Sequence, residues 1–460
     1  MMDNISCRGF WGASAKPFWL DEQTPTSNVL SQELIVDVAI IGGGFAGLST
    51  AYSLIERDPN LIIAILDAGL IGSCASGANS GQCSPRIGGN ILGLLKKYGP
   101  EKAAAIYQYS LDLVQYVQHL INKENIQCDL ECTGQLNVAT TELQAVRLQN
   151  QAQTYQNLGF NVPYLDKKKT NDAIFSPLYK GAIKYVSAFN LNPAKLCTGL
   201  KTSVQNKGVW IYENTPVQHI RPGDVTEVVA NNHTIRANTV VLTTNAFINQ
   251  FNLFARQIVP MKTNIMVSDP LTGNELSSLK WKNREGIYDA GQLFSYYRLT
   301  KDNRILFGGG YEVFDRKRRD QNNLTPDSKI KTSLLSEFRR IFPSLKELGF
   351  PYSWGGKVGM TLDSFPIITK IKDTNIFYAG GWNGHGVAQA TAIGPVLSDL
   401  IEQKNSIHTI GWPWIRSNAP KIPPSLIAVP FLKSYMQIMR SLDTIGRAVD
   451  KIQKKEISAK

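Results

Sequence analysis

Three glycines and one aspartate are spaced as in a site that binds a dinucleotide. Gly42, Gly44 and Gly47 lie between the apolar run LIVDVAII (34–41) and a helical pattern. There the first glycine permits a tight turn, the second lets the backbone approach a pyrophosphate, and the third lets helix and strand pack closely. Asp67 ends the next apolar run, 20 residues after Gly47, where a carboxylate can accept hydrogen bonds from ribose hydroxyls. The pattern predicts a strand–helix–strand unit that binds FAD or NAD, and it does not distinguish between them.

A long loop of small residues, DAGLIGSCASGANSGQ (67–82), follows the second apolar run. It resembles the loop of D-amino-acid-oxidase-type flavoproteins, which commonly reads GASGRNGGQ. The matching residues are Ser76, Gly77, Asn79, Gly81 and Gln82, whereas Ala78 and Ser80 depart from the commonest pattern. The resemblance implies FAD as the cofactor, with this loop close to the flavin. Taken by itself, the segment also fits a solvated flexible loop.

Four further blocks extend the resemblance over about residues 11–410. They are FNLNPAKLCTGL, ANTVVLTTNAF, SYYRLTKDNRILFGGG and NIFYAGGWNGHGV, and they are similar to the γ-glutamylputrescine oxidase-like branch of that family. The resemblance implies oxidation of a primary or secondary amine to an imine by hydride transfer to flavin N5, followed by hydrolysis. The further site residues that it implies are Asn245, Gly381, Gly384, His385, Gly386 and Val387 for the cofactor, and His385, Tyr297 and Trp382 for catalysis.

The block GGWNGHGV also has a physical interpretation. Its glycines remove side chains where a strand gives way to a helix, so backbone N–H groups can point at a ligand. In the family this helix start faces the flavin pyrimidine, where its positive end would stabilise the reduced, anionic flavin. His385 either donates a hydrogen bond there or is a packed or surface histidine.

The segment GQLFSYYRLT predicts a strand with two different faces. Period-two alternation places Phe294, Tyr296 and Arg298 on one face and Ser295, Tyr297 and Leu299 on the other. One face is expected either to wall the flavin site or to belong to a core of aromatic residues with a snorkelling arginine.

Three departures from the family pattern narrow the expected function. Glycine oxidase-like members hold the substrate carboxylate with an arginine where WGGKVGMT (354–361) has Val358, with Lys357 as its neighbour. This disfavours a small α-amino acid as the substrate. Leu306 or Phe307 occupies the place of a lysine that promotes reaction with oxygen in some members, so the acceptor is O2 or a quinone. VGMTLDSFP contains no cysteine and residues 67–90 contain no histidine, so we expect non-covalent FAD.

Other functions of the same fold remain open on the sequence alone. They are an amino-acid dehydrogenase that passes electrons to quinone, a tRNA-modifying flavoenzyme, and a flavin-binding scaffold without turnover. The formal net charge is +12, but half of it lies in residues 416–460, which carry nine basic and three acidic side chains. Because no RNA-binding module accompanies this charge, nucleic acid is not an expected partner.

Composition bounds the class of protein. The 460 residues, 43% of them hydrophobic, suffice for two or three domains. No run of 18 apolar residues and no signal peptide is present, so we expect a cytoplasmic protein, with contact at the inner face of the membrane as an alternative. The six cysteines form no CxxC pair, so we expect reduced thiols and no metal site.

The order of apolar patterns predicts an α/β plus α+β fold. It combines a discontinuous Rossmann-type FAD-binding domain, an antiparallel-sheet substrate domain and a C-terminal helical tail. Helices are expected at 91–122 and 142–157, and a hairpin at about Lys301–Asn303. The expected segments are an N-terminal arm (1–33), the FAD-binding domain (34–125, 181–258 and 351–410), the substrate domain (126–180 and 259–350), a linker (411–425) and an amphipathic basic helix (426–460).

The tail has the pattern of a two-faced helix. Its apolar seam is Phe431, Tyr435, Ile438, Leu442, Ile445, Val449 and Ile452, and its basic stripe on the opposite face is Lys433, Arg440, Arg447 and Lys454. Such a helix can dock on its own subunit, pair with a second copy or lie on an anionic membrane. The position of the basic stripe opposite the seam weakens the membrane alternative, because interfacial helices usually bring basic side chains to the headgroups.

Overall fold

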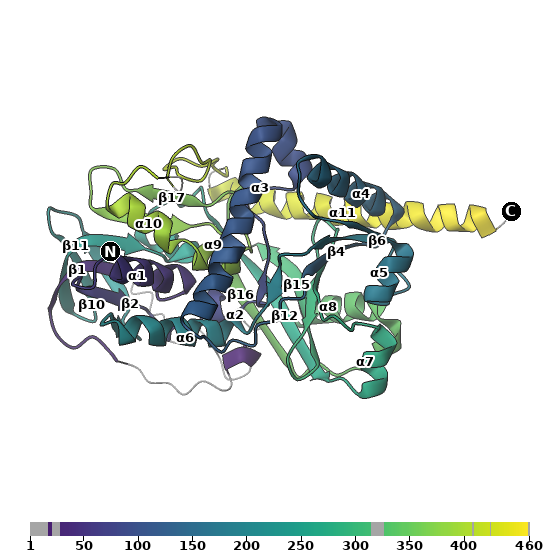
Figure 1. The fold of residues 1–460 in the computed structure, drawn as a ribbon, viewed down its shortest axis with the longest axis horizontal. Coiled ribbons are helices and arrows are strands. Elements are labelled where there is room, and N and C mark those ends of the chain that lie inside the picture. The colour runs from purple at the N-terminus through teal and green to yellow at the C-terminus, as the bar shows by residue number, and fades with distance from the viewer. Residues whose placement is uncertain (1–16, 21–27, 314–325, 407–408, 424, 459–460) are drawn as a thin grey trace.

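Two large sheets organise the molecule, and each carries its own helices (Figure 1). The computed structural model describes residues 17–20, 28–313, 326–406, 409–423 and 425–458. The predicted α/β plus α+β class is confirmed.

The first sheet has parallel strands at its centre. β1 (Leu34–Ile41) pairs in parallel with β2 and with β11 and occupies the predicted apolar run. In spatial order the strands are β17 (Ile367–Lys370), β18 (Ile376–Gly380), β11 (His233–Leu242), β1, β2 (Ile63–Leu66) and β8 (Trp210–Tyr212), with β10 (Thr226–Ala230) on β11 and β9 (Val217–Arg221) on β10. The helices packed with α1 (Phe45–Arg57) and with one another are α3 (Ile91–Lys123), α6 (Pro193–Asn206), α9 (Gly386–Thr391) and α10 (Gly394–Ile401).

The second sheet is mostly antiparallel. The predicted hairpin is confirmed, because β14 pairs with β15 across a turn in which Asn303 has a φ of 60°. In spatial order the strands are β16 (Tyr352–Met360), β12 (Val259–Pro270), β15 (Arg304–Val313), β14 (Tyr296–Leu299), β13 (Gly286–Asp289), β4 (Gln135–Ala139), β6 (Gly181–Tyr185) and β5 (Tyr164–Asp166). The helices of this lobe are α4 (Glu142–Asn157), α5 (Lys167–Ala173), α7 (Gly273–Leu279) and α8 (Ser328–Ile341).

Short elements join the two lobes. β3 (Gln82–Cys83) pairs with β7 (Phe189–Asn190), and α2 (Ala75–Ala78) follows the second strand of the first sheet. Three 3-10 turns complete the structure: η1 (Phe18–Leu20), η2 (Asn245–Phe251) and η3 (Pro343–Leu345).

Two expected domain boundaries are corrected by strand pairing. The segment 181–258 was expected in the FAD-binding domain, but β6 pairs with β4 and β5 of the second sheet. The segment 351–410 was also expected there, but β16 pairs with β12 along its whole length. Strand pairing is decided by partners far away in the chain, and local patterns do not report them.

The N-terminal arm contacts the body of the protein through Trp19. Trp19 of η1 is buried and donates a hydrogen bond from its indole nitrogen to the backbone oxygen of Asn79, 2.9 Å away. Residues 1–16 and 21–27 of the arm lie outside the described residues.

The tail forms the predicted helix, α11 (Ser425–Ser458), which extends along the second lobe past α4 (Figure 1). It docks through Leu432 and Met436, which are buried. The predicted seam lies beside this docked face and is exposed at Phe431, Tyr435, Ile438, Leu442 and Ile445, by 46–58% of each residue's surface. Docking by the seam itself is therefore wrong. The side chains of Val449, Ile452, Arg440 and Lys454 lie outside the described residues.

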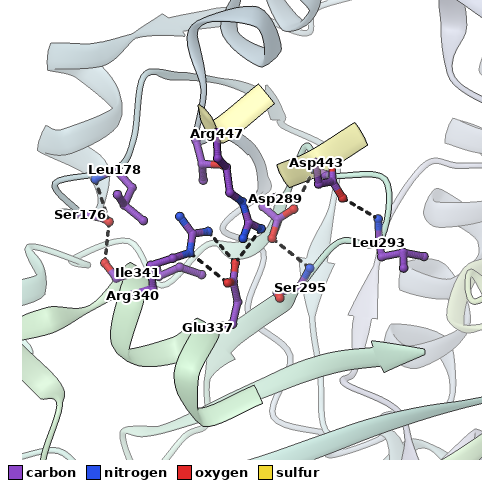
Figure 2. A network of polar contacts seen from close by, with 12 residues as sticks. Ser176, Leu178, Asp289, Leu293, Ser295, Glu337, Arg340, Ile341, Asp443 and Arg447 are labelled. Atoms are coloured by element: carbon purple, nitrogen blue, oxygen red, sulfur yellow. Dashed lines mark hydrogen bonds and ion pairs between the residues drawn. The ribbon is translucent and has the colours of Figure 1, made fainter. Parts of the chain in front are cut away.

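Polar contacts continue the docked face toward the C-terminus (Figure 2). Asp443 accepts hydrogen bonds from the backbone nitrogens of Gln292 and Leu293, and Arg447 forms an ion pair with Glu337 at 3.4 Å. These contacts fix α11 against the loop that joins β13 and β14 and against α8.

No disulfide forms among the cysteines that the structure describes. The thiols of Cys74, Cys83, Cys128, Cys132 and Cys197 are reduced, as expected, while Cys7 lies outside the described part. Among the helices of the described ranges, none combines the length and apolarity needed to cross a membrane.

Candidate active site

The predicted glycine turn connects β1 to α1. Gly42 has a φ of +105°, which glycine adopts easily, and its nitrogen donates to the backbone oxygen of Leu66 at 2.9 Å. A Cβ on Gly47 would overlap the backbone oxygen of Gly42, so this glycine permits the close packing of helix and strand. Thr243, after β11, donates to the backbone oxygens of Ile41 and Gly42 at 3.0 and 2.7 Å and so supports the turn.

Asp67 lies at the end of β2, beside this turn. Its carboxylate accepts hydrogen bonds from the backbone nitrogens of Gly43 and Gly69 at 2.7 and 2.8 Å. Burial raises the pKa of Asp67 to about 6, although these two N–H groups act in the opposite direction. The carboxylate is therefore ionised at neutral pH and available at a cavity wall.

The loop after β2 folds over the start of α1. Ser76 Oγ accepts a hydrogen bond from the backbone nitrogen of Phe45 at 3.0 Å. Asn79 closes the loop, because its amide nitrogen donates to the backbone oxygen of Ser76 and its oxygen accepts from Gly81 N. Gly81 has a φ of +71°, and a Cβ there would overlap the backbone oxygen of Leu191. The segment is thus an ordered structural element and not a solvated flexible loop.

Two side chains from this region and from β14 lock the loop to the second sheet. Gln82 donates to the backbone oxygen of Tyr297 at 3.0 Å and accepts from Gln135 at 2.7 Å. Arg298 is 1% exposed and donates to the backbone oxygen of Leu191 at 2.7 Å, with longer contacts to Ser80 O and Gly81 O. Burial lowers the pKa of Arg298 to about 10, so it stays charged. This positioning role was not predicted, because it requires carbonyl groups from two distant segments.

The nucleotide cavity, about 220 Å³, lies above the glycine turn. The predicted residues that line it are Gly42, Gly44, Asp67, Ser76, Asn79, Asn245, Trp382, Gly384, Gly386 and Val387. Gly47, Gly77, Gly81 and Gly381 lie outside its wall and shape the backbone around it. Asn245 lines the cavity and also holds the backbone beside it, since its side-chain oxygen accepts a hydrogen bond from Gly381 N at 2.9 Å.

The central cavity, about 480 Å³, adjoins the nucleotide cavity. Ala75, Asn79, Val358 and Gly384 line both cavities, so the two spaces form one continuous site. Gly384 has a φ of +80°, and a Cβ added to it would meet no atom within 4 Å, so its backbone faces open space.

His385 and Gln82 are the other predicted residues in the central cavity wall. His385 is partly buried and precedes the first residue of α9. Burial, and then the positive charge of Arg86, hold the pKa of His385 well below its usual value. The imidazole is therefore neutral at physiological pH and can donate or accept a hydrogen bond.

Aromatic residues of β14 and its neighbours form one wall of the central cavity. Phe294 and Tyr296 face it, and the Tyr296 hydroxyl lies 3.1 Å from the Thr263 hydroxyl. Phe294 and Tyr296 of the predicted face therefore line this cavity, whereas Arg298 of the same face braces the loop. Tyr297 lies on the opposite face of the strand and is fully buried. Its hydroxyl forms a hydrogen bond with the hydroxyl of Tyr179. The structure does not bring Tyr297 to the cavity, which corrects its predicted catalytic role.

Another part of the wall comes from the tail. Phe431, Leu432, Tyr435 and Met436 of α11 line the central cavity. This contribution was not predicted from the sequence. The apolar period of the tail was its only signal, and such a period does not identify the surface that the helix meets.

Comparisons with known proteins agree with this geometry. The family model described as DAO, FAD dependent oxidoreductase, matches residues 37–400. The probable oxidoreductase OrdL of Haemophilus influenzae is 29% identical over 384 residues, covering 81% of this chain and 84% of that protein. The gamma-glutamylputrescine oxidoreductase of Escherichia coli is 29% identical over 380 residues, covering 81% and 85%.

Solved structures show the same fold. The glycine oxidase of Geobacillus kaustophilus superposes with a TM-score of 0.67 at 21% identity, over 81% of this chain and 96% of that chain. The L-proline dehydrogenase of P. horikoshii gives a TM-score of 0.67 at 19% identity, over 82% and 96%. The resemblance found in the sequence is confirmed.

Proposed function

Because the chain belongs to the DAO family of FAD-dependent oxidoreductases, we propose that it oxidises an amine of the γ-glutamylputrescine type to an imine. A relative named for that activity is 29% identical over most of both chains. The amine carbon gives up a hydride, the nitrogen gives up a proton, and water then hydrolyses the imine. FAD, when bound, supplies the hydride acceptor.

The two joined cavities suit FAD. Asp67 would accept hydrogen bonds from ribose hydroxyls, and the N–H groups at the start of α1 would meet the pyrophosphate. Among the described residues that line either cavity, Cys74 is the only cysteine, and it lies in the nucleotide cavity. We therefore propose non-covalent FAD.

The observation that carries the substrate proposal is the charge of the central cavity. Its described walls contain no carboxylate, and Arg86 is their only full positive charge. A bound ammonium ion would lack a counter-ion and would meet a guanidinium, so the amine binds in its neutral form. The neutral form has the nitrogen lone pair that assists hydride loss. The neutral imidazole of His385 can accept a hydrogen bond from the amine N–H and so orient the nitrogen.

Val358 adds to this proposal. It lines both cavities and occupies the position at which glycine oxidase-like members of the family carry a carboxylate-binding arginine. A charge-assisted pair with such an arginine would contribute about 1.5–3 kcal/mol. An amine without a carboxylate on the reacting carbon is therefore favoured over a small α-amino acid.

We also propose that the enzyme passes its electrons to a quinone at an anionic membrane surface. No lysine is found among the described residues of the central cavity wall, and Leu306 and Phe307 are fully buried. The exposed seam of α11 begins at Phe431, in the wall of that same cavity. Insertion of the seam among lipid headgroups would bring the cavity to the place where quinones dissolve.

Anaerobic titration tests the substrate proposal. We expect γ-glutamylputrescine to bleach the visible flavin absorbance of the yellow protein, with glycine and alanine much less effective. Bleaching that depends on added RNA, or no bleaching by any amine, would refute amine oxidation. Sedimentation with anionic liposomes, combined with faster reoxidation by a soluble quinone analogue than by O2, tests the acceptor.

A further inference from the structure

A third cavity, lined by polar side chains, adjoins the central cavity. This space, here called the annex, has a volume of about 190 Å³ and shares Arg86, Tyr288, Gln292 and Phe294 with the central cavity. Its other walls come from the segment 85–90, from α3 and α4, from strands β4, β6 and β13, and from the loop between β13 and β14. The oxidation of an amine at the flavin does not by itself require such a space.

Arg86 lies where the two cavities meet. Its backbone is fixed from α9, because Gln389 donates a hydrogen bond to its carbonyl oxygen at 2.8 Å. Its guanidinium lies over the ring of Tyr288, 5.6 Å from the centroid. Within the described residues no carboxylate lies within ion-pair distance of it, so its charge is available to a ligand.

Arg147 of α4 brings a second guanidinium to the annex. One terminal nitrogen donates to the backbone oxygen of Ala290. Its Nε is buried and has no hydrogen-bond partner in the described part of the chain. A buried donor without a partner costs free energy, and a ligand with an acceptor oxygen would remove that cost.

Two acceptors complete the annex. Asp289 accepts hydrogen bonds from the backbone nitrogens of Gly291 and Ser295 at 2.8 and 3.0 Å, and no described cation pairs with it (Figure 2). Asn137 is 8% exposed, and its side-chain oxygen is buried without a partner among the described residues. Asp443 of α11 also contacts the loop after Asp289, because its carboxylate accepts a hydrogen bond from the backbone nitrogen of Gln292.

The annex therefore combines two guanidinium groups with a carboxylate and an unpaired amide oxygen. This set complements a zwitterion that carries one carboxylate and one ammonium group. A simple polyamine fits it poorly, because it brings no anion to Arg86 and Arg147 and leaves both guanidinium groups without a partner. A simple dicarboxylate fits poorly as well, because it would meet Asp289 and Asn137 with acceptor oxygens only.

We propose that the annex binds the free α-amino-acid head of a γ-glutamyl amine, an inference that rests on the function proposed above and specifies its substrate class. The head's carboxylate pairs with Arg147 and Arg86, and its ammonium pairs with Asp289 and the Asn137 oxygen. The alkyl chain passes the walls shared with the central cavity, and the distal amine reaches the flavin site. Val358 agrees with this arrangement, because the substrate carboxylate lies far from the reacting carbon.

The test is a specificity ratio, kcat/KM for γ-glutamylputrescine divided by kcat/KM for putrescine, which lacks the head. We expect a ratio well above one in the FAD-bound protein. Arg147→Gln should lower the ratio roughly 10- to 100-fold, as for a lost charge-assisted pair, and Arg147→Lys should restore part of it. Arg221→Gln is the matched control, because Arg221 is 65% exposed on β9 and lines none of the cavities.

Two further measurements keep the inference falsifiable if Arg147→Gln fails to fold. Asn137→Leu, which replaces the unpaired acceptor by an apolar group, should also lower the ratio. L-glutamine, which has the head but no alkylamine chain, should compete with γ-glutamylputrescine. A wild-type ratio near one, or ratios unchanged in both variants, would overturn the annex while amine oxidation stands. Failure of every amine to reduce the flavin would instead overturn the proposed function.

Discussion

The nucleotide cavity and the central cavity are built in different ways. The nucleotide cavity has one contiguous part of its wall, residues 41–79, which presents glycines, backbone N–H groups and one carboxylate. The central cavity and its annex draw side chains from segments between residues 75 and 436. A common cofactor can be recognised by local backbone geometry, whereas a particular substrate requires side chains that only tertiary structure brings together.

The difference extends to the way each cavity is closed. The nucleotide cavity has no described residue of α11 in its wall, whereas four residues of that helix line the central cavity. Changes in the first region should therefore affect FAD binding, and changes in the tail should affect the amine. Substitutions and truncations in the two regions can test this separation.

The largest effect is expected for Gly44→Val. A Cβ at this position would come within 2.6 Å of Ser76 Oγ, and the further methyl groups would occupy space that the pyrophosphate needs. Overpacking costs about 1–3 kcal/mol or more, so FAD affinity should fall roughly 100-fold. Flavin absorbance of the purified protein measures the loss. Gly273→Val is the control, because nothing lies within 4 Å of its Cβ position, and equal flavin loss there would mean general destabilisation.

Deletion of residues 425–460 should separate the two cavities functionally. The truncated protein should keep FAD but lose an apolar wall, so kcat/KM for the amine should fall roughly 10- to 100-fold. Flavin content and steady-state kinetics measure the two effects. A shorter deletion, 453–460, leaves the contacts of Asp443 and Arg447 in place and should change neither. Loss of FAD in the long deletion, or unchanged kinetics, would contradict the claim that α11 contributes to the amine site and not to FAD binding.

Local sequence patterns predicted the elements whose signals are contiguous. β1 and the turn at Gly42 follow from an apolar run that ends in glycine, and α4 and the β14–β15 hairpin from periodicity and turn residues. The same alternation correctly separated Tyr297 from Tyr296. It could not tell which face meets the cavity, because that depends on the packing of β14 against distant strands.

Other features depended on partners that no local pattern contains. Arg298 is buried because Leu191 and the loop at Gly81 supply carbonyl acceptors, a role that a strand pattern cannot reveal. The apolar seam of the tail stays largely exposed, with only Phe431 and Tyr435 of its described residues at the central cavity, since Leu432 and Met436 meet the body one position further round the helix. A helical period identifies an apolar stripe, but the surface that receives the helix decides which face is buried.

A moderate effect of pH on FAD affinity should come from Asp67. Its pKa of about 6 in the folded protein means that the carboxylate, the form that accepts ribose hydrogen bonds, prevails above pH 6. As pH falls below 6 the group takes up a proton, so FAD affinity should weaken by up to about tenfold per pH unit. Fluorescence titration with FAD between about pH 5 and 8 measures this. Asp67→Asn should bind more weakly at neutral pH and show a flat profile, and a persistent slope would assign the pH effect to another group.

The smallest effect is expected for the ion pair that attaches the tail in Figure 2. Arg447 is 43% exposed and its nitrogen lies 3.4 Å from Glu337, whose carboxylate also pairs with Arg340. A partly exposed pair of this kind contributes about 0–1 kcal/mol, so Arg447→Ala should hardly change the free energy of unfolding in urea. Leu432→Ala, in contrast, removes a buried side chain and should cost about 2–5 kcal/mol where the helix meets the central cavity. The reverse order would mean that charge, and not apolar burial, holds this wall of the cavity in place.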